Sequence, residues 1–371
     1  MKRFIALIAG MTLLLGACGG DDAGTPEVSA DAKATFTSAV QALAEGPGIT
    51  ATLSVLSDSA SLQAMAADEG DEMSAETADK ILSSSLSISA KNTTDPKEAA
   101  SQILINIAGT DAFEVRVLGY NLFLRADARS IATTFGQDPA GLDMLAQQAA
   151  AGGMGFVKDA LDGKWLAIEG LDQLTKSLTG QDPSAAAAQQ QEMVDQFAQI
   201  LSDSSTVGSE GEDEFGEHLV ATFPLRALFD NFKELVAGSG IPGAEFPDSA
   251  EVPDESITLD VWVRDGKVTQ IVFDFMQIAE IEDEEIPEGV EQLGLKIELA
   301  EFAGTVEEPA DAVKIDPMQI MGLFMGMPGP DAGGGGMDDY SSGFPCETLK
   351  GEPREVLIQF KKECPHLLKK R

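Results

Sequence analysis

The stretch from Val261 to Phe275, VWVRDGKVTQIVFDF, decides the fold class. Its centre, Asp265-Gly266, suits a two-residue type I′ turn, because both central residues of such a turn need positive φ. The stretch therefore predicts an antiparallel β-hairpin. The predicted pairs across it are Val263 with Val268, Val261 with Gln270, and Leu259 with Val272.

This register predicts a hairpin that is apolar on both faces. One face carries the pairs just named, and the other carries Trp262, Ile271, Phe273 and Phe275. Such a sheet is covered on both sides, or covered on one side and facing a cavity on the other. A register slip would move these residues between faces but would leave both faces apolar.

Apolar residues alternate in several other segments, which predicts further strands. These are expected at 49–56, 86–88, 102–125 as a meander, 164–168, 217–223, 257–264, 268–277 and 293–302. Helical spacing predicts helices after the caps Ser29 and Asp31, at 75–82, over much of 126–202, and at 225–237. The fold class predicted from these patterns is α+β, with a large antiparallel sheet.

Residues 1–18, MKRFIALIAGMTLLLGAC, are organised like a secretory signal. The apolar stretch 4–15 is shorter than the roughly 20 residues that cross a bilayer. Its end, LGAC, resembles a bacterial lipobox, which implies removal of a signal peptide 1–17 and a diacylglyceryl anchor on Cys18. The protein would then be extracytoplasmic and anchored to the cell membrane as a lipoprotein. Secretion with a free thiol at Cys18 is the alternative.

The chain is strongly acidic, with 62 Asp and Glu against 25 Lys and Arg and a net charge of −37. Removal of the signal peptide, which contains Lys2 and Arg3, would change the net charge from −37 to −39. Such a charge repels nucleic acid and anionic headgroups, so neither is an expected ligand of the bulk surface.

The order of these features resembles actinobacterial cell-envelope lipoproteins. The lipobox, the first helix, GYNLFLRADARSIATTFGQDP, GKWLAIEG and VWVRDGKVTQIVFDF together are similar to the LppX/LprG group and, more distantly, to LolA- and LolB-like carriers. The resemblance spans roughly 30–303. It implies a curved half-barrel with helices over its concave face, enclosing an apolar pocket that carries acyl chains. An Ala/Gln-rich insertion and a C-terminal extension depart from the smaller members.

Five segments are expected along the chain. They are a signal peptide at 1–17, a flexible tether at 18–31, the α+β half-barrel domain at 32–303, a Met/Gly-rich linker at 304–345, and a basic C-terminal segment at 346–371.

The expected function is binding of an acyl-chain lipid or another amphiphile, for transport or presentation in the envelope. Inward-facing sheet residues are the pocket candidates, namely Phe113, Val115, Leu122, Leu124, Ile271 and Phe273. The same residues could instead belong to a filled core, in which case the protein would be a non-catalytic envelope scaffold. A third hypothesis is an extracellular hydrolase that uses the acidic loops for catalysis.

The sequence offers no catalytic constellation. His218 lies within EGEDEFGEH (210–218), whose spacing matches neither a calcium loop nor a zinc set, so a solvated acidic loop is expected there and at 280–288. P-loop, G-x-S-x-G and dinucleotide motifs are absent. The chain is therefore predicted to be no enzyme and to need no metal or cofactor.

Cys346 and Cys364 remain once Cys18 is assigned to lipid, and in an oxidising compartment two such cysteines usually pair. A helix from Pro353 to Cys364 would bring them within reach of one disulfide. A methionine-rich helix is expected after Asp316. It would close the domain's core or contact an apolar ligand or partner, and copper binding by its methionines is a third hypothesis. The final segment carries seven Lys and Arg against four Glu, and is expected to be a solvated tail or to touch anionic lipid or the protein's own acidic surface.

Overall fold

The structure is a computed structural model. It describes residues 27–93, 95–151, 154–172, 176, 183–238, 249–281, 285–302 and 304–316. The lipobox with Cys18, the methionine-rich helix, and both Cys346 and Cys364 lie outside the described residues. The lipid anchor and the disulfide therefore stay predictions.

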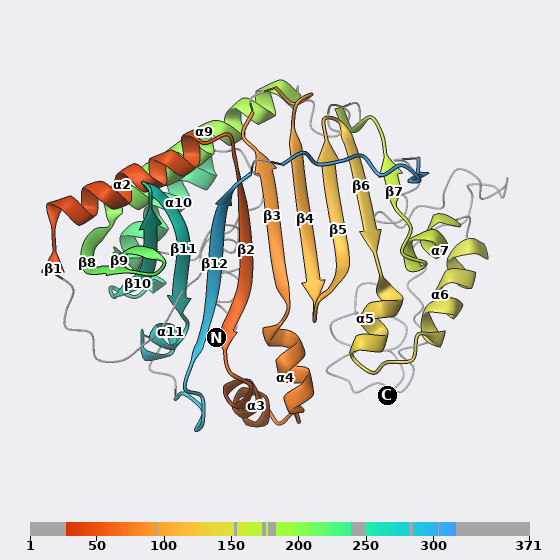
Figure 1. The fold of residues 1–371 in the computed structure, drawn as a ribbon, viewed down its shortest axis with the longest axis horizontal. Coiled ribbons are helices and arrows are strands. Elements are labelled where there is room, and N and C mark those ends of the chain that lie inside the picture. The colour runs from red at the N-terminus through yellow and green to blue at the C-terminus, as the bar shows by residue number, and fades with distance from the viewer. Residues whose placement is uncertain are drawn as a thin grey trace, which may run out of the picture.

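Thirteen strands of the described chain form one sheet in the order β1-β8-β9-β10-β11-β12-β2-β3-β4-β5-β6-β7-β13 (Figure 1). Neighbouring strands pair antiparallel, except that β13 pairs parallel with β7. The strands are β1 Glu27–Val28, β2 Gly48–Ser57, β3 Ser85–Lys91, β4 Ala100–Ile107, β5 Thr110–Leu118, β6 Asn121–Ala126, β7 Leu166–Ile168, β8 Thr206–Asp213, β9 Gly216–Pro224, β10 Ser256–Arg264, β11 Lys267–Asp274, β12 Leu293–Glu301 and β13 Val313–Lys314.

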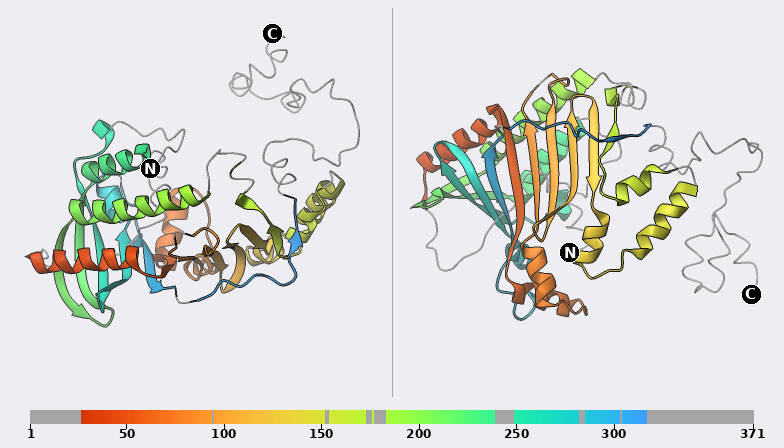
Figure 2. Two further views of the ribbon diagram at one scale, coloured as in Figure 1. Left: turned by 90° about the horizontal axis from the view of Figure 1, so that it is seen from above. Right: turned by 45° about the vertical axis from the view of Figure 1, so that its right-hand side comes forward.

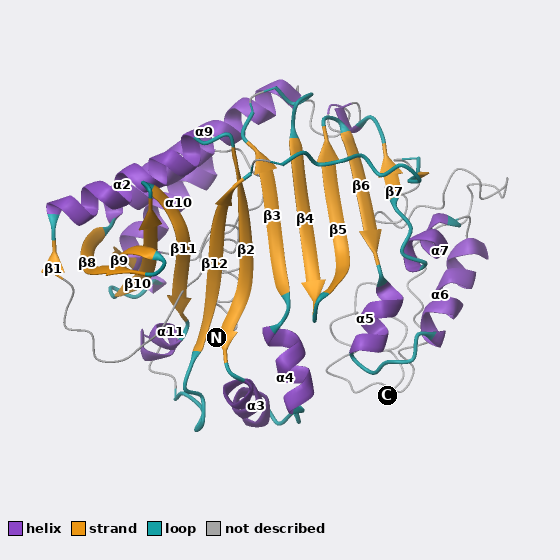
Figure 3. Cartoon of the chain, in the orientation of Figure 1, coloured by secondary structure: helices purple, strands orange, loops and turns teal. Residues whose placement is uncertain are grey.

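The helices lie along one face and at the ends of this sheet (Figure 3). They are α2 Ala30–Glu45, α3 Ser59–Asp68, α4 Ala75–Leu82, α5 Ala128–Thr134, α6 Ala140–Ala151, α7 Phe156–Leu161, α9 Pro183–Ser204, α10 Leu225–Gly238 and α11 Met276–Ile281, with a 3₁₀ turn η1 at Ser249–Glu251. The α+β class predicted from the sequence is confirmed, although α3 was not predicted.

The sheet is curved, because the strands from β8 to β12 turn away from the plane of β2 to β6 when the molecule is seen from above (Figure 2). Helices α9 and α10 lie on the concave side of this bend. Helix α2 contacts β8 and β11, and α9 contacts both α2 and α10. The expected half-barrel with helices over its concave face is therefore the observed arrangement.

Helix α2 begins where its predicted cap stands. The Ser29 side chain accepts a hydrogen bond from the Ala32 backbone N–H at 2.9 Å, which satisfies one of the free donors of the first turn. Phe36 and Val40, one turn apart, are both buried against the sheet. The cap and the apolar face thus fix the start of the helix and the side that it presents to the core.

The β10–β11 hairpin has the predicted turn. Asp265 and Gly266 adopt φ values of 53° and 72°, and Val263 pairs with Val268 as expected. Beyond that pair the predicted register is wrong, because Trp262 pairs with Gln270 and leaves Thr269 as an extra residue in β11. This β-bulge flips the rest of β11, as an inserted residue does in a ladder of period two.

The bulge changes which residues share a face. Val261 pairs with Ile271, so Ile271 and Phe273 lie on the concave face with Val261, and not on the opposite face with Trp262. Both faces are nevertheless apolar, since Val261 is buried on one side while Trp262 and Val272 are buried on the other. The prediction of a sheet with two apolar faces is confirmed.

The prediction of a solvated loop at 210–218 is wrong. These residues belong to the β8–β9 hairpin, in which Glu212 pairs with Glu217 and Gly211 with His218. The pairing supplies the backbone hydrogen bonds, so acidic side chains can stand on the exposed part of β8 without the apolar alternation that marks a buried strand.

After β12 the chain crosses the convex face of the sheet and ends its described part at β13, beside β7 (Figure 1). The crossing segment is tied to the sheet where Arg116 Nη1 donates to the Glu307 carbonyl at 2.8 Å. Residues 304–316 had been expected in the linker, whereas Val313 and Lys314 pair with the sheet.

Beneath this crossing lies a buried ionic cluster. The Glu114 carboxylate is 4% exposed and pairs with Arg116 at 2.6 Å and Arg125 at 3.2 Å. Both guanidinium groups also lie over the Trp165 ring, at 4.6 and 5.3 Å from its centroid. The cluster joins β5 and β6 to the segment that leads into β7, and satisfies a charge that would otherwise be costly to bury.

Candidate ligand-binding cavity

An apolar cavity of about 280 Å³ lies between helices α2 and α9 and the concave face of the sheet. All of its lining residues are apolar, and they come from two helices and six strands. They are Phe36, Val40, Leu43 and Ala44 of α2, Phe197, Ala198 and Leu201 of α9, Ile49, Ala51 and Leu53 of β2, Ile88 of β3, Phe223 of β9, Leu259 and Val261 of β10, Val268 and Ile271 of β11, and Ile297 and Leu299 of β12.

Its size lies near the lower end of the range for small-molecule sites, roughly 300–1,000 Å³. A cavity without polar partners for water tends to stay dry and to accept apolar ligands. The site can therefore bind by burial of apolar groups.

The two helices above the cavity are fixed to each other. The Lys33 ammonium of α2 donates to the backbone carbonyls of Ser202 and Ser205 and, at 3.0 Å, to the Ser205 hydroxyl. These carbonyls lie at the C-terminal end of α9, where a cation is favoured. Burial lowers the pKa of Lys33, and the nearby Asp203 carboxylate opposes this effect. At the sheet, Phe36 meets Phe223 edge to face at 6.4 Å between ring centroids.

The apolar floor of the cavity continues along the sheet. Cross-strand pairing builds two rows of apolar residues on the concave face, each running from the cavity toward β6. One row is Ile271, Ile297, Leu53, Leu86, Ile105 and Phe113, and the other is Leu299, Ala51, Ile88, Ile103, Val115 and Leu124.

The structure brings the six pocket candidates onto one face of the sheet but not into one cavity. Ile271 lines the cavity, and Phe273 lies two residues along the same strand and is buried in the core. Phe113 and Val115 lie in the two rows on β5, two strands or roughly 10 Å beyond β3. Leu124, which ends the second row, and Leu122 lie on β6. These four side chains are half-buried.

Sequence reasoning did not assign the helical lining residues to a site. Phe36, Val40 and Leu43 were predicted to share one face of a helix, and this spacing could have marked them as lining. Phe197 and Leu201 show the same i, i+4 spacing within an Ala/Gln-rich segment. No pattern within either helix indicates that α9 lies beside α2.

On the convex face of the same strands, His218 forms a polar cluster with carboxylates. Its Nε2 lies 2.6 Å from Asp260 and its Nδ1 3.3 Å from Glu210, and its ring stacks on Trp262 at 4.3 Å. The Trp262 Nε1 donates to Asp213 at 2.7 Å. Burial lowers the pKa of His218, but the hydrogen bond to Asp260 and the surrounding carboxylates outweigh burial and raise that pKa above its ordinary value.

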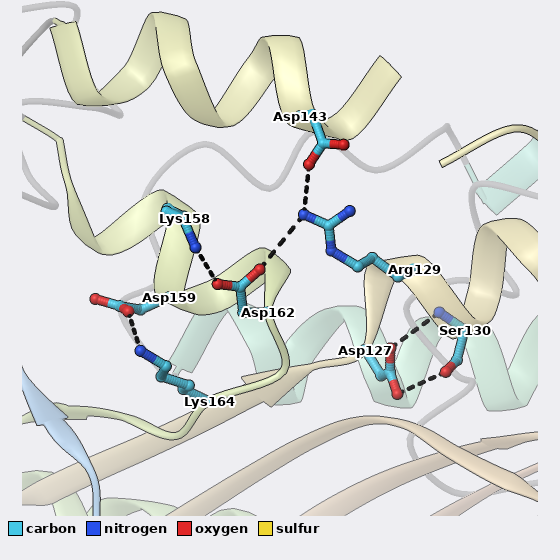
Figure 4. Close-up of polar contacts among 8 residues, drawn as sticks. All are labelled: Asp127, Arg129, Ser130, Asp143, Lys158, Asp159, Asp162 and Lys164. Atoms are coloured by element: carbon cyan, nitrogen blue, oxygen red, sulfur yellow. Dashed lines mark hydrogen bonds and ion pairs between the residues drawn. The ribbon is translucent and has the colours of Figure 1, made fainter. Parts of the chain in front are cut away.

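A third polar cluster joins helices α5, α6 and α7 (Figure 4). Arg129 bridges Asp143 at 2.7 Å and Asp162 at 3.4 Å, and Lys158 pairs with Asp162. The hydrogen bond from Lys158, together with the charges of Lys158 and Arg129, holds the pKa of Asp162 below its usual value despite an opposing effect of burial. Exposed pairs of this kind add little stability each, so the cluster mainly orients the three helices.

Within the described parts of the chain, no group of three or more His, Cys, Asp or Glu side chains is placed to hold a metal ion. Among the helices described, none combines the length and apolar character that would span a bilayer.

Comparison with known proteins finds no matching family model and no matching curated protein. Among solved structures, the chain is similar to the lipoprotein LppX of Mycobacterium tuberculosis, with 9% identity and a TM-score of 0.30 over 75% of this chain and 97% of that one. It is also similar to LprF from Mycobacterium bovis, with 11% identity and a TM-score of 0.35 over 78% of this chain and 100% of that one. The chain is thus similar in structure to two mycobacterial lipoproteins.

Proposed function

We propose that the protein is an envelope lipoprotein, anchored through Cys18, that binds the acyl chain of a lipid or other amphiphile for transport or presentation. The observation that carries the proposal is the wholly apolar cavity between α2, α9 and the sheet. Because every side chain that lines this cavity is apolar, the interaction that it offers a ligand is mainly the burial of apolar groups.

The energy available from burial is substantial but limited. A methylene group has about the volume of a water molecule, roughly 30 Å³, so a 280 Å³ cavity holds about nine of them. At about 0.8 kcal/mol per methylene, they would contribute about 7 kcal/mol. Association itself costs roughly 4–15 kcal/mol, so useful affinity needs additional contacts from the rest of the ligand.

The apolar rows beyond the cavity support the proposal in a second way. Ile103 in one row is 38% exposed, and Phe113 and Val115 farther along the two rows are half-buried. A longer acyl chain could leave the cavity along these rows and remain on apolar surface. This path would include three of the pocket candidates that lie outside the cavity, Phe113, Val115 and Leu124.

The first experiment would measure bound lipid in the mature chain. The protein would begin at residue 18 with Cys18→Ser, follow a cleavable secretion signal, and be produced in an actinobacterial host. Native mass spectrometry and analysis of organic extracts should find about one lipid per chain. Ala198→Phe should fill the cavity and reduce bound lipid at least fivefold, while the free energy of unfolding changes by less than about 1.5 kcal/mol, because the new ring enters empty space.

The matched control is Ala67→Phe, the same substitution at an exposed position near the end of α3. It should leave bound lipid unchanged. Folded wild-type protein that repeatedly yields no lipid would contradict the proposal and favour the scaffold alternative.

A further inference from the structure

A second cavity adjoins the apolar one, and we call it the mouth. It has a volume of about 560 Å³ and lies among the end of α2, the turn into β2, the β10–β11 turn and the end of β12. The residues shared by the mouth and the apolar cavity are Leu43, Ile49, Val268 and Leu299. The two spaces are therefore neighbours, and one molecule could occupy both.

The mouth differs from the apolar cavity in its charged lining. Two cations and three carboxylates line it, all on exposed residues, namely Arg264, Lys267, Glu45, Asp265 and Glu301. Two positive against three negative charges leave the lining at −1.

Both cations of the mouth already have partners. The Lys267 ammonium pairs with Glu301 from the neighbouring strand, and the Arg264 guanidinium donates to the Glu214 carbonyl. A negatively charged group entering the mouth would have to compete for these cations and would face an excess of carboxylates. The net charge of −37 adds to this repulsion.

We infer that the mouth holds the head of the bound amphiphile and selects heads without net negative charge, that is, zwitterionic or uncharged ones. This inference rests on the proposed function, since a head needs a chain in the adjoining cavity. Backbone and carboxylate acceptors of the mouth would accept hydrogen bonds from such a head, and its carboxylates would lie near any positive group. The apolar cavity buries the acyl chain of the amphiphile, and the mouth determines which head groups bind.

The test compares two probes with one chain, myristoyl lysophosphatidylcholine and myristoyl lysophosphatidylglycerol, which are zwitterionic and anionic. Binding would be measured by titration calorimetry on the mature Cys18→Ser chain, after removal of bound lipid and below micellar concentrations. The zwitterionic probe should bind at least about fivefold tighter, the size expected for one repulsion between charges in water. Raising the salt from 20 to 500 mM should reduce this ratio, because mouth residues are exposed.

The variant that isolates the mouth is Glu45→Gln with Glu301→Gln, which should bring the two affinities within about twofold. The matched control is Glu285→Gln with Glu288→Gln, which changes the net charge equally but lies before the first residue of β12, whereas Glu301 is its last residue. It should keep the wild-type ratio.

Equal affinities in the wild type, tighter binding of the anionic probe, or a ratio unchanged in the mouth variant would overturn the inference and leave the proposed function standing. Failure of both probes and of myristoyl glycerol to bind would overturn the proposed function, and this inference with it.

Discussion

His218 lies against an indole ring and between carboxylates of two neighbouring strands, so its charge is coupled to the stability of the sheet. The groups that face it are Asp260 of β10, Glu210 of β8 and Asp213 at the end of β8. Because its pKa is raised from 6.5 in the folded protein, its contribution is fully present below about pH 6.5 and is lost as pH rises through the folded pKa.

The first prediction is that His218→Gln destabilises the protein at pH 5.5 and much less at pH 8.5. A loss of about 1.5–3 kcal/mol is expected at the lower pH, the range for hydrogen bonds to charged groups. Urea denaturation at both pH values measures the difference between variant and wild type. The only other histidine, His366, is common to both proteins, so its titration cancels. A difference that does not change with pH would contradict the prediction.

At the same scale, one inserted residue decides what lines the cavity. Thr269 is the extra residue of the β10–β11 bulge, and its hydroxyl donates to the Trp262 carbonyl at 3.3 Å. Without the insertion, Ile271 would share the convex face with Trp262. The cavity therefore gains Ile271 through a local break in the ladder that apolar alternation alone does not predict.

Among the elements, the β10–β11 turn is the one whose conformation is most fully set by its own residues. Gly266 has φ of 72°, a region that costs a residue with a side chain roughly 1–2 kcal/mol. A Cβ at this position would meet no atom within 4 Å, so conformation alone would cause the cost.

The second prediction is that Gly266→Ala lowers the free energy of unfolding by about 1 kcal/mol. Gly141→Ala in helix α6 is the matched control, because its Cβ also meets nothing within 4 Å and its backbone is helical. That variant should be more stable than wild type by about 0.5–1 kcal/mol. Urea denaturation measures both. A Gly266→Ala protein as stable as wild type would show that the turn tolerates another conformation.

The strands and the helices around the cavity are stabilised by different interactions. The sheet side is a continuous antiparallel ladder from β9 to β3, whereas the helical side depends on packing and on the Lys33 contacts with the end of α9. We therefore expect the lining from α2 and α9 to adjust more readily to a ligand than the lining from the strands.

At the scale of the whole molecule, charge is the dominant property. A net charge of −37 favours solubility but opposes the compact state through repulsion among the carboxylates. Buried pairs such as Glu114 with Arg116 are screened little by salt, whereas the exposed majority of charges are screened strongly.

The third prediction is that salt stabilises the protein. Raising NaCl from 10 to 500 mM should raise the Tm by about 1–2 °C, the shift that corresponds to about 1 kcal/mol in a chain of 371 residues. Differential scanning calorimetry measures the change, and KCl at equal ionic strength should give the same result if screening is the cause. A fall in Tm with salt would mean that attractive surface pairs outweigh the net repulsion.

The sequence by itself determined the features that depend on neighbours along the chain. The Asp265-Gly266 turn, the Ser29 cap and the apolar spacing of Phe36 and Val40 are local, because backbone dihedrals and the periods of helix and strand act over a few residues. They were sufficient for the α+β class and for an apolar concave face.

The tertiary structure alone decided which part of that face is hollow. Phe36, Phe197 and Leu259 come from three distant segments, and whether their side chains fill the space between them depends on how far apart α2, α9 and β10 lie. The same holds for the mouth, where Glu45 and Lys267 come together only because α2 crosses the end of the β10–β11 hairpin. Packing between distant elements leaves no periodic pattern in the sequence. The position of the cavity and of the mouth therefore follows only from the tertiary structure.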